Sequence, residues 1–273
     1  MSQEKDPLSQ YHRFLDETGD TTFYGRGDKL LVGTKGVSNT FGIALVKIRA
    51  PLDDVRTEIL ELQKQVESDE LLNTIPSVRK RIEKGGFFFH ACKDTPDVRA
   101  VFLRYLKTLS CEAEVVMARK LPEVFKAKHD RQEDSFYGDL LSHLIKRRLK
   151  RSGSLVLNVA ERGSSTRDRV LFRALEIAKA RASKRWETEE LRSKVVYNVQ
   201  NPQREPLLSI SDYLAWAVQR VFEKGETRFY DYLFSKIRLV VDLYDFEKYG
   251  GSRNYYDKRN PLTSKNKISP PIT

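Results

Sequence analysis

Phe14-Leu15-Asp16-Glu17-Thr18-Gly19-Asp20 is the stretch of sequence that decides the fold. The segment Tyr11–Leu15 predicts a β-strand, and Asp16 to Asp20 predict its end, because Asp and Glu are poor strand residues. An acid at the end of a central strand must be solvated, paired or bound to metal, and ligands of open α/β sheets collect at such ends. A plain turn accounts for the same residue types and stays open as the alternative.

After this stretch, segments typical of strands and of helices alternate along the chain. Strands are expected at Asn39–Ile48 (less convincingly at Leu30–Val32), Phe87–Cys92, Cys111–Ala118, Leu155–Val159 and Lys194–Val199. Helices are expected from Pro51 to Leu72, from Asp94 to Leu109, and at Ser135–Lys150, Ser165–Trp186, Leu207–Glu223 and Thr227–Phe234. Leu239–Leu243 fits either a short strand or a continuation of the last helix. The alternation predicts an α/β fold, a mixed sheet with helices on its faces, with Pro51–Glu83 as a helical insertion.

The sequence predicts a single domain followed by a C-terminal tail. No linker-like stretch separates two halves, so residues 1–248 are predicted to form one domain. From residue 249 onward Gly, Ser, Asn, Lys and Pro dominate. Residues 249–273 are therefore predicted to be a basic, largely irregular tail.

The composition excludes several classes of protein. Of 273 residues, 40% are hydrophobic and 32% charged, which is not the composition of a disordered chain. No apolar run approaches the roughly 18 residues of a membrane helix, and the first residues lack an apolar signal core. Cys92 and Cys111 are too few for a disulfide framework or a zinc site. We expect both to be buried free thiols in strands, in a reducing cytoplasm.

The net charge of +11 favours a polyanionic partner, because Lys and Arg displace counterions condensed on phosphates. The residues expected to contact nucleic acid lie at the end of one predicted helix and at the start of the next, on either side of the predicted strand Leu155–Val159. They are Lys146, Arg147, Arg148, Lys150, Arg151, Arg167, Arg169 and Arg173. Cations at a helix C-terminus also stabilise the helix dipole, so a structural role stays open for part of this set.

Two further acids stand in positions comparable to Asp16. Glu161 follows the predicted strand Leu155–Val159, and Asp212 lies in the first turn of a predicted helix. Three such acids suit hard cations, and a pair of Mg²⁺ or Mn²⁺ ions bound by them would support phosphodiester cleavage. The alternatives are a turn or an ion pair with Arg162 or Arg167 for Glu161, and a capping box with Ser209 for Asp212.

His90 ends the predicted strand Phe87–Cys92. Near a metal site it would act as a proton shuttle or as the acid for a leaving group. The alternative is a satisfied, partly buried histidine with no chemical role.

These motifs, taken in order, resemble the domain-of-unknown-function family 3800. The resemblance rests on Phe14–Asp20, on Phe88-Phe89-His90-Ala91, and on Leu207-Leu208-Ser209-Ile210-Ser211-Asp212. It implies a ribonuclease H-like fold and a suspected nuclease activity, within a defence or mobile-element system. It also implies that Asp16, Glu161 and Asp212 are metal ligands, with Glu17 as a secondary ligand or as the partner of a basic residue.

The sequence departs from the family pattern at several of the same positions. Thr18 stands where the pattern has Ser, Ser209 where it has Gln, and Ser211 where it has Ala; Glu161 stands where Asp is common. Two hypotheses follow. The chain is a metal-dependent nuclease that uses Asp16, Glu17, His90, Glu161 and Asp212, or it is a non-catalytic nucleic-acid-binding or complex-assembly subunit on the same fold, in which the acids form turns, caps and ion pairs.

Overall fold

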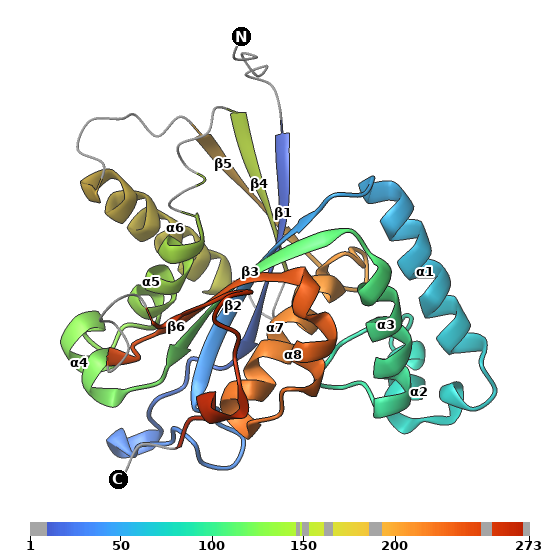
Figure 1. The fold of residues 1–273 in the computed structure, drawn as a ribbon, viewed down its shortest axis with the longest axis horizontal. Coiled ribbons are helices and arrows are strands. Elements are labelled where there is room, and N and C mark those ends of the chain that lie inside the picture. The colour runs from blue at the N-terminus through green and yellow to red at the C-terminus, as the bar shows by residue number, and fades with distance from the viewer. Residues whose placement is uncertain are drawn as a thin grey trace.

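The fold is built on one mixed sheet, seen in a computed structural model that describes residues 10–145, 148, 153–160, 166–185, 193–246 and 253–269. Seven strands lie in the order β5-β4-β1-β2-β3-β6-β7 (Figure 1). Their bounds are β1 Gln10–Gly19, β2 Thr40–Ile48, β3 Cys111–Arg119, β4 Gly153–Ala160, β5 Ser193–Gln200, β6 Ile237–Leu243 and β7 Tyr255–Tyr256. The pairs β1–β4, β4–β5 and β3–β6 are parallel, whereas β2 and β7 run antiparallel to their neighbours.

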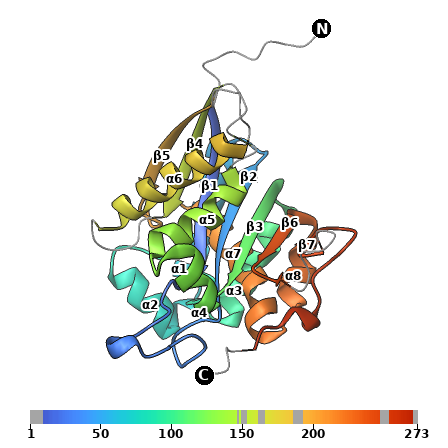
Figure 2. The ribbon, with the colours of Figure 1, turned by 90° about the vertical axis from the view of Figure 1, so that its left-hand side faces the viewer.

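Helices cover both faces of this sheet, which confirms the predicted α/β fold (Figures 1 and 2). Residues of α1 (Leu52–Ser68), α2 (Pro76–Glu83), α3 (Pro96–Thr108), α7 (Leu208–Lys224) and α8 (Arg228–Leu233) share one buried cluster. Residues of α4 (Pro122–His129), α5 (Glu133–Ile145) and α6 (Thr166–Arg185) share the other. Neighbours on β1 divide between the two, Phe14 to the first and Leu15 to the second, because successive strand side chains point to opposite faces.

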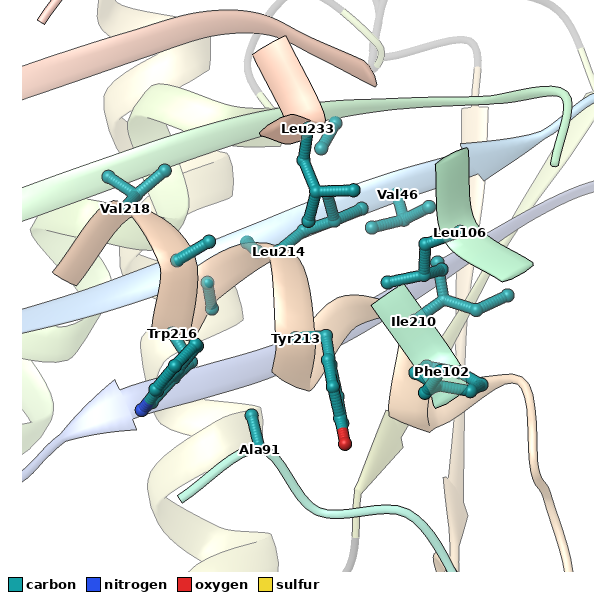
Figure 3. Close-up of a cluster of buried hydrophobic side chains, with 14 of the residues drawn as sticks. Val46, Ala91, Phe102, Leu106, Ile210, Tyr213, Leu214, Trp216, Val218 and Leu233 are labelled. Carbon is teal, nitrogen blue, oxygen red and sulfur yellow. The ribbon is translucent and has the colours of Figure 1, made fainter. Parts of the chain in front are cut away.

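Helix α7 organises the first cluster. Ile210, Tyr213, Leu214 and Val218 are all fully buried. Leu214 packs beside β2, whereas Tyr213 extends toward the segment that carries Ala91 (Figure 3). Burial of one such side chain contributes about 1.5–3 kcal/mol. The helix therefore fixes the sheet and this segment relative to one another.

The segment Phe87–Cys92 is not a strand, so that prediction is wrong. Phe87 and Phe89 are buried in the core, but their backbone pairs with no strand of the sheet. Buried peptide groups need partners, and here side chains supply them. The bonds are Arg81 Nη1 to Phe88 O (2.8 Å), Ser209 Oγ to Phe89 O (2.9 Å), Arg99 Nε to Ala91 O (3.0 Å), Ala91 N to Asp212 Oδ2 (2.7 Å) and His90 N to Asp94 Oδ2 (2.9 Å).

The end of β1 also differs from the prediction. The strand runs on to Gly19, and Thr18 faces Gly42 of β2, so the residues expected to form a turn are paired in the sheet. Gly19 has φ 82°, and a Cβ there would lie 2.3 Å from the carbonyl oxygen of Thr40. Only glycine fits this position, because L-residues with a side chain avoid that conformation and that contact.

Other predicted boundaries are adjusted in the structure. Helix α1 ends at Ser68 and not at Leu72, and Leu239–Leu243 belongs to a strand, β6. Cys111 is buried as predicted, at the start of β3. Cys92 is exposed, which corrects the expectation of a second buried thiol. It lies in a turn that follows the unpaired segment Phe87–His90.

The described part of the C-terminal segment, residues 253–269, packs against the domain. Tyr255 and Tyr256 pair with β6, and Tyr256 and Leu262 are buried in the first cluster. The amide of Ile268 donates to the carbonyl of Phe222 at the end of α7 (2.8 Å). Among the described residues, no helix has both the length and the apolar character needed to cross a membrane.

Candidate active site

A cleft of about 1180 Å³ opens where the parallel strands β1, β4 and β5 end. Asp16 of β1, Ala160 at the end of β4 and Asn201 just after β5 all line it. The carboxyl ends of parallel strands are where open α/β sheets bind their ligands. The cleft is bounded by residues 33–39 of the β1–β2 loop, by the segment Phe88–Lys93 and by α7.

Asp16 lies half-buried in the cleft, and its Oδ1 accepts the N–H of Glu17 (2.8 Å). It shares its sheet face with Phe14 and Thr18, the face that α7 covers. Glu17 also lines the cleft, but strand alternation places its side chain on the opposite face, with Leu15. The side chains of Asp16 and Glu17 therefore point to opposite faces of the sheet.

The residues after Glu17 fix the end of β1 to its surroundings. Thr18 Oγ1 donates to Gln219 Oε1 of α7 (2.5 Å), and Asp20 accepts bonds from Ser38 Oγ (2.7 Å) and from Lys120 Nζ (2.9 Å). Burial raises the pKa of Asp20, but the bonds from Ser38 and Lys120 outweigh it and hold that pKa below its usual value. Asp20 is therefore a structural anion that ties the loop to the end of β3.

Asp212 and His90 meet on the α7 side of the cleft. The Oδ2 of Asp212 accepts the N–H of Ala91 (2.7 Å) and lies 3.3 Å from Nδ1 of His90. The side chains of His90 and Asp212 are 29% and 13% exposed, so both are reached from the cleft. The capping box with Ser209, the alternative role for Asp212, is absent, because α7 begins at Leu208 and Ser209 donates to Phe89 O instead. Asp212 therefore lies beyond the first turn of α7, which corrects its predicted place in that turn.

A buried acid outside the cleft supports the position of His90. Asp94 accepts the N–H of His90 and the hydroxyl of Tyr213, and its Oδ1 lies 2.7 Å from Nη2 of Arg81. Burial raises the pKa of Asp94, although the charge of Arg81 opposes that rise. Asp94 and Asp212 thus hold successive peptide groups of the same segment, at His90 and at Ala91.

The third predicted acid, Glu161, lies outside the described residues. Ala160, which precedes it, is the last described residue of β4 and lines the cleft. Among the described residues, no three His, Cys, Asp or Glu side chains form a metal-binding group. Asp16 and Asp212 are therefore the members of the predicted ligand set that the structure brings into one cleft.

Most of the predicted phosphate-binding residues lie outside the part of the chain that the structure describes. Lys146, Arg147, Lys150 and Arg151 are not described, and neither are the side chains of Arg167 and Arg169 on α6. Arg148 pairs with Glu114 (2.7 Å), and Arg173 pairs with Asp134 (2.8 Å). Neither of these two arginines lines the cleft. Contact of this set with nucleic acid stays a prediction.

Most residues of the cleft were not predicted from the sequence, and four of them bear on ligand binding. Lys35, Lys93 and Lys224 are exposed at its edge, and Phe88 is half-buried beside His90. The lysines are isolated in the sequence and come from three separate elements, so no local cluster marks them. Phe88 belongs to a run of three phenylalanines, and only the path of its segment shows that Phe88 is half-buried in the cleft whereas Phe87 and Phe89 are buried.

Comparison with known proteins gives no family assignment. No protein-family model matches the chain, and no curated protein matches it with significant sequence similarity.

Proposed function

We propose that this protein is a divalent-metal-dependent nuclease that hydrolyses phosphodiester bonds in DNA or RNA. One observation carries the proposal: Asp16, His90 and Asp212, which are far apart in the sequence, line one cleft at the carboxyl ends of parallel strands. A ribonuclease H-like arrangement of the sheet is part of the proposal. The position of β1, between antiparallel β2 and parallel β4, supports it.

The chemistry of the side chains fits a hard cation such as Mg²⁺ or Mn²⁺. Carboxylate oxygens are the ligands these ions prefer, and the described part of the cleft has no Cys–His cluster that would favour zinc. Asp212 Oδ1 has no hydrogen-bond partner among the described residues, so it remains available as a ligand. Asp16 and Asp212 would hold the metal, with Glu161 as the proposed third ligand. When bound, the metal would activate water and stabilise the charge on the phosphate.

The remaining groups position the reacting atoms. Oδ2 of Asp212 lies 3.3 Å from Nδ1 of His90, a close contact without hydrogen-bond geometry, and Nε2 of His90 would exchange a proton with a phosphate ester in the cleft. Asp94 and Asp212 fix the peptide groups of His90 and Ala91, so the imidazole stands on a rigid segment. Rigid placement of a proton donor matters because small displacements of a catalytic group reduce its contribution strongly.

The decisive test is the variant Asp16→Asn, assayed on labelled single-stranded and duplex DNA and RNA with Mg²⁺ or Mn²⁺. We expect the wild-type protein to cleave one of these substrates, and the variant to cleave it at least about 100-fold more slowly. Circular dichroism and thermal unfolding would show that the variant is folded. Cleavage by the wild type that persists in EDTA, or that survives the substitution, contradicts the proposal.

The second candidate is a non-catalytic nucleic-acid-binding or complex-assembly subunit. One observation favours it: Asp212 Oδ2 already accepts the N–H of Ala91, a structural use of the proposed ligand. Ser209, at a departure from the family pattern, likewise serves the structure by donating to Phe89. This candidate predicts salt-sensitive binding that EDTA does not change and no cleavage with any metal. A place in the cytoplasm, in a defence or mobile-element complex, is compatible with either candidate.

A further inference from the structure

Three exposed lysines and one half-buried aromatic ring line the cleft, and the described residues give these lysines no ion pair. We propose that Lys35, Lys93 and Lys224 bind phosphates along a single-stranded nucleic acid that runs through the cleft, and that Phe88 stacks on one of its bases. The inference rests on the proposed function in one respect, that the cleft receives nucleic acid. It adds the strand type and the residues that bind it.

The three lysines come from separate elements that the fold brings to one rim. Lys35 lies in the β1–β2 loop, where Thr34 and Val37 close two turns through their amides. Lys93 lies in the turn that its own amide closes on the carbonyl of His90 (3.0 Å). Lys224 is the last residue of α7. Folding therefore concentrates positive charge that the sequence disperses.

The charges of these lysines are unpaired, which distinguishes them from the other cations nearby. All three are exposed, and none forms an ion pair or a side-chain hydrogen bond with a described residue. In contrast, Arg220 in the same cleft pairs with Glu226, and Lys120 behind it pairs with Asp20 (2.9 Å). Unpaired cations at the mouth of a cleft attract a polyanion and set its position without reading its sequence.

Phe88 indicates which form of nucleic acid fits. Its neighbours Phe87 and Phe89 are buried in the core, whereas Phe88 is half-buried and lines the cleft next to His90. A ring in a basic groove stacks on bases, and the faces of bases are accessible only in a single strand. The partly buried Asp212 points to the same conclusion. A flexible strand can bring one phosphate down to a side chain that is only 13% exposed.

The experiment measures binding apart from cleavage, in full-length protein that carries Asp16→Asn. Fluorescence anisotropy with a labelled dT12 strand, an rU12 strand and a 12-base-pair duplex would be recorded between 50 and 300 mM KCl. The test variant adds K35Q, K93Q and K224Q. The matched control adds K64Q, a single exposed lysine of α1 that does not line the cleft.

We expect the triple variant to bind the strand at least about 10-fold more weakly at 100 mM salt, with a log–log salt slope reduced by about 2. Phe88→Ala should weaken strand binding by about 10-fold and leave the salt slope unchanged. K64Q should behave as its parent. The duplex should bind more weakly than either strand.

The inference is overturned if the triple variant binds as tightly as K64Q, if the duplex binds as tightly as the strands, or if no strand binds. These outcomes separate the two proposals. Binding as expected without any cleavage by the wild-type protein would reject the nuclease and keep the binding site. If the three lysine substitutions, made in the otherwise wild-type protein, leave cleavage unaffected, the binding site is rejected and the nuclease is kept.

Discussion

Two pairs of aspartate and histidine lie on opposite faces of the sheet and differ in their access to solvent. Asp212 and His90 meet on the α7 side, with side chains 13% and 29% exposed. Asp139 of α5 and His129 of α4 lie on the other side, with side chains 6% and 0% exposed. The same residue types thus occur once in an open cleft and once in a sealed core.

The sealed pair is satisfied entirely by the protein. The hydroxyl of Tyr244 stands between its members, 2.8 Å from His129 Nε2 and 2.5 Å from Asp139 Oδ2. Lys128 Nζ lies 2.6 Å from the same carboxylate, and Ser135 Oγ lies 3.2 Å from the other imidazole nitrogen. A network of this kind stabilises the fold. In the open pair, one carboxylate oxygen has no described partner, as a binding site requires. Accessibility, and not residue type, separates the structural pair from the candidate site.

The largest effect is expected from Asp212→Asn in the open pair. The amide keeps the size of the side chain and can still accept the N–H of Ala91, but the charge and a metal ligand are lost. Cleavage should fall at least about 100-fold, which corresponds to about 2.7 kcal/mol. Urea unfolding should show a loss of no more than about 1 kcal/mol. A large loss of stability with cleavage retained would assign Asp212 to the fold alone.

The reverse result is expected from Asp139→Asn in the sealed pair. Loss of the charge leaves the buried Tyr244 hydroxyl without its ionic acceptor, whereas Lys128, whose side chain is 47% exposed, stays solvated. The free energy of unfolding should fall by about 2 kcal/mol, measured by urea denaturation. Cleavage below the unfolding transition should be unchanged, because Asp139 does not line the cleft. A loss of activity in the folded variant would show that the two faces are coupled.

The smallest effect is expected from Ser209→Ala. This substitution tests whether the bond from Ser209 to Phe89 helps to hold the segment that carries His90. Its buried hydroxyl donates to Phe89 O (2.9 Å), so its removal should cost about 1 kcal/mol of stability. Cleavage should fall less than about 10-fold, since Asp94 and Asp212 still hold the segment. Ser211→Ala is the matched control, because Ser211 Oγ is buried with no described partner. Equal effects of the two substitutions would show that the bond to Phe89 does not stabilise the segment.

Regular elements with strong periodicity could be predicted from the sequence. The alternating pattern of Asn39–Ile48 corresponds to β2, and the apolar face of Leu207–Glu223 corresponds to α7. The placement of Asp16 and Asp212 could be anticipated as well, because acids next to an apolar element are conspicuous. Both line the same cleft.

Features that depend on distant side chains could not be predicted. The apolar run Phe87–Phe89 is typical of a strand, and nothing within it shows that its backbone bonds to Arg81, Ser209 and Arg99. The pairing of Thr18 with Gly42 likewise depends on β2, which overrides the weak strand preference of the acids. The three lysines come to line one cleft only after folding, so their separate positions in the sequence carry no signal.

The short strand β7 has a consequence for the behaviour of the whole sheet. Tyr255 and Tyr256 pair with Val241 and Val240 of β6, and Asn254 bonds to the backbone of Asp242, so a short stretch of chain covers that edge. A row of unsatisfied peptide groups beside buried valines is a template for pairing between chains. Truncation of the chain just before Tyr255 would expose that row and turn the edge of the sheet into a surface for aggregation, with no change to any residue of the cleft.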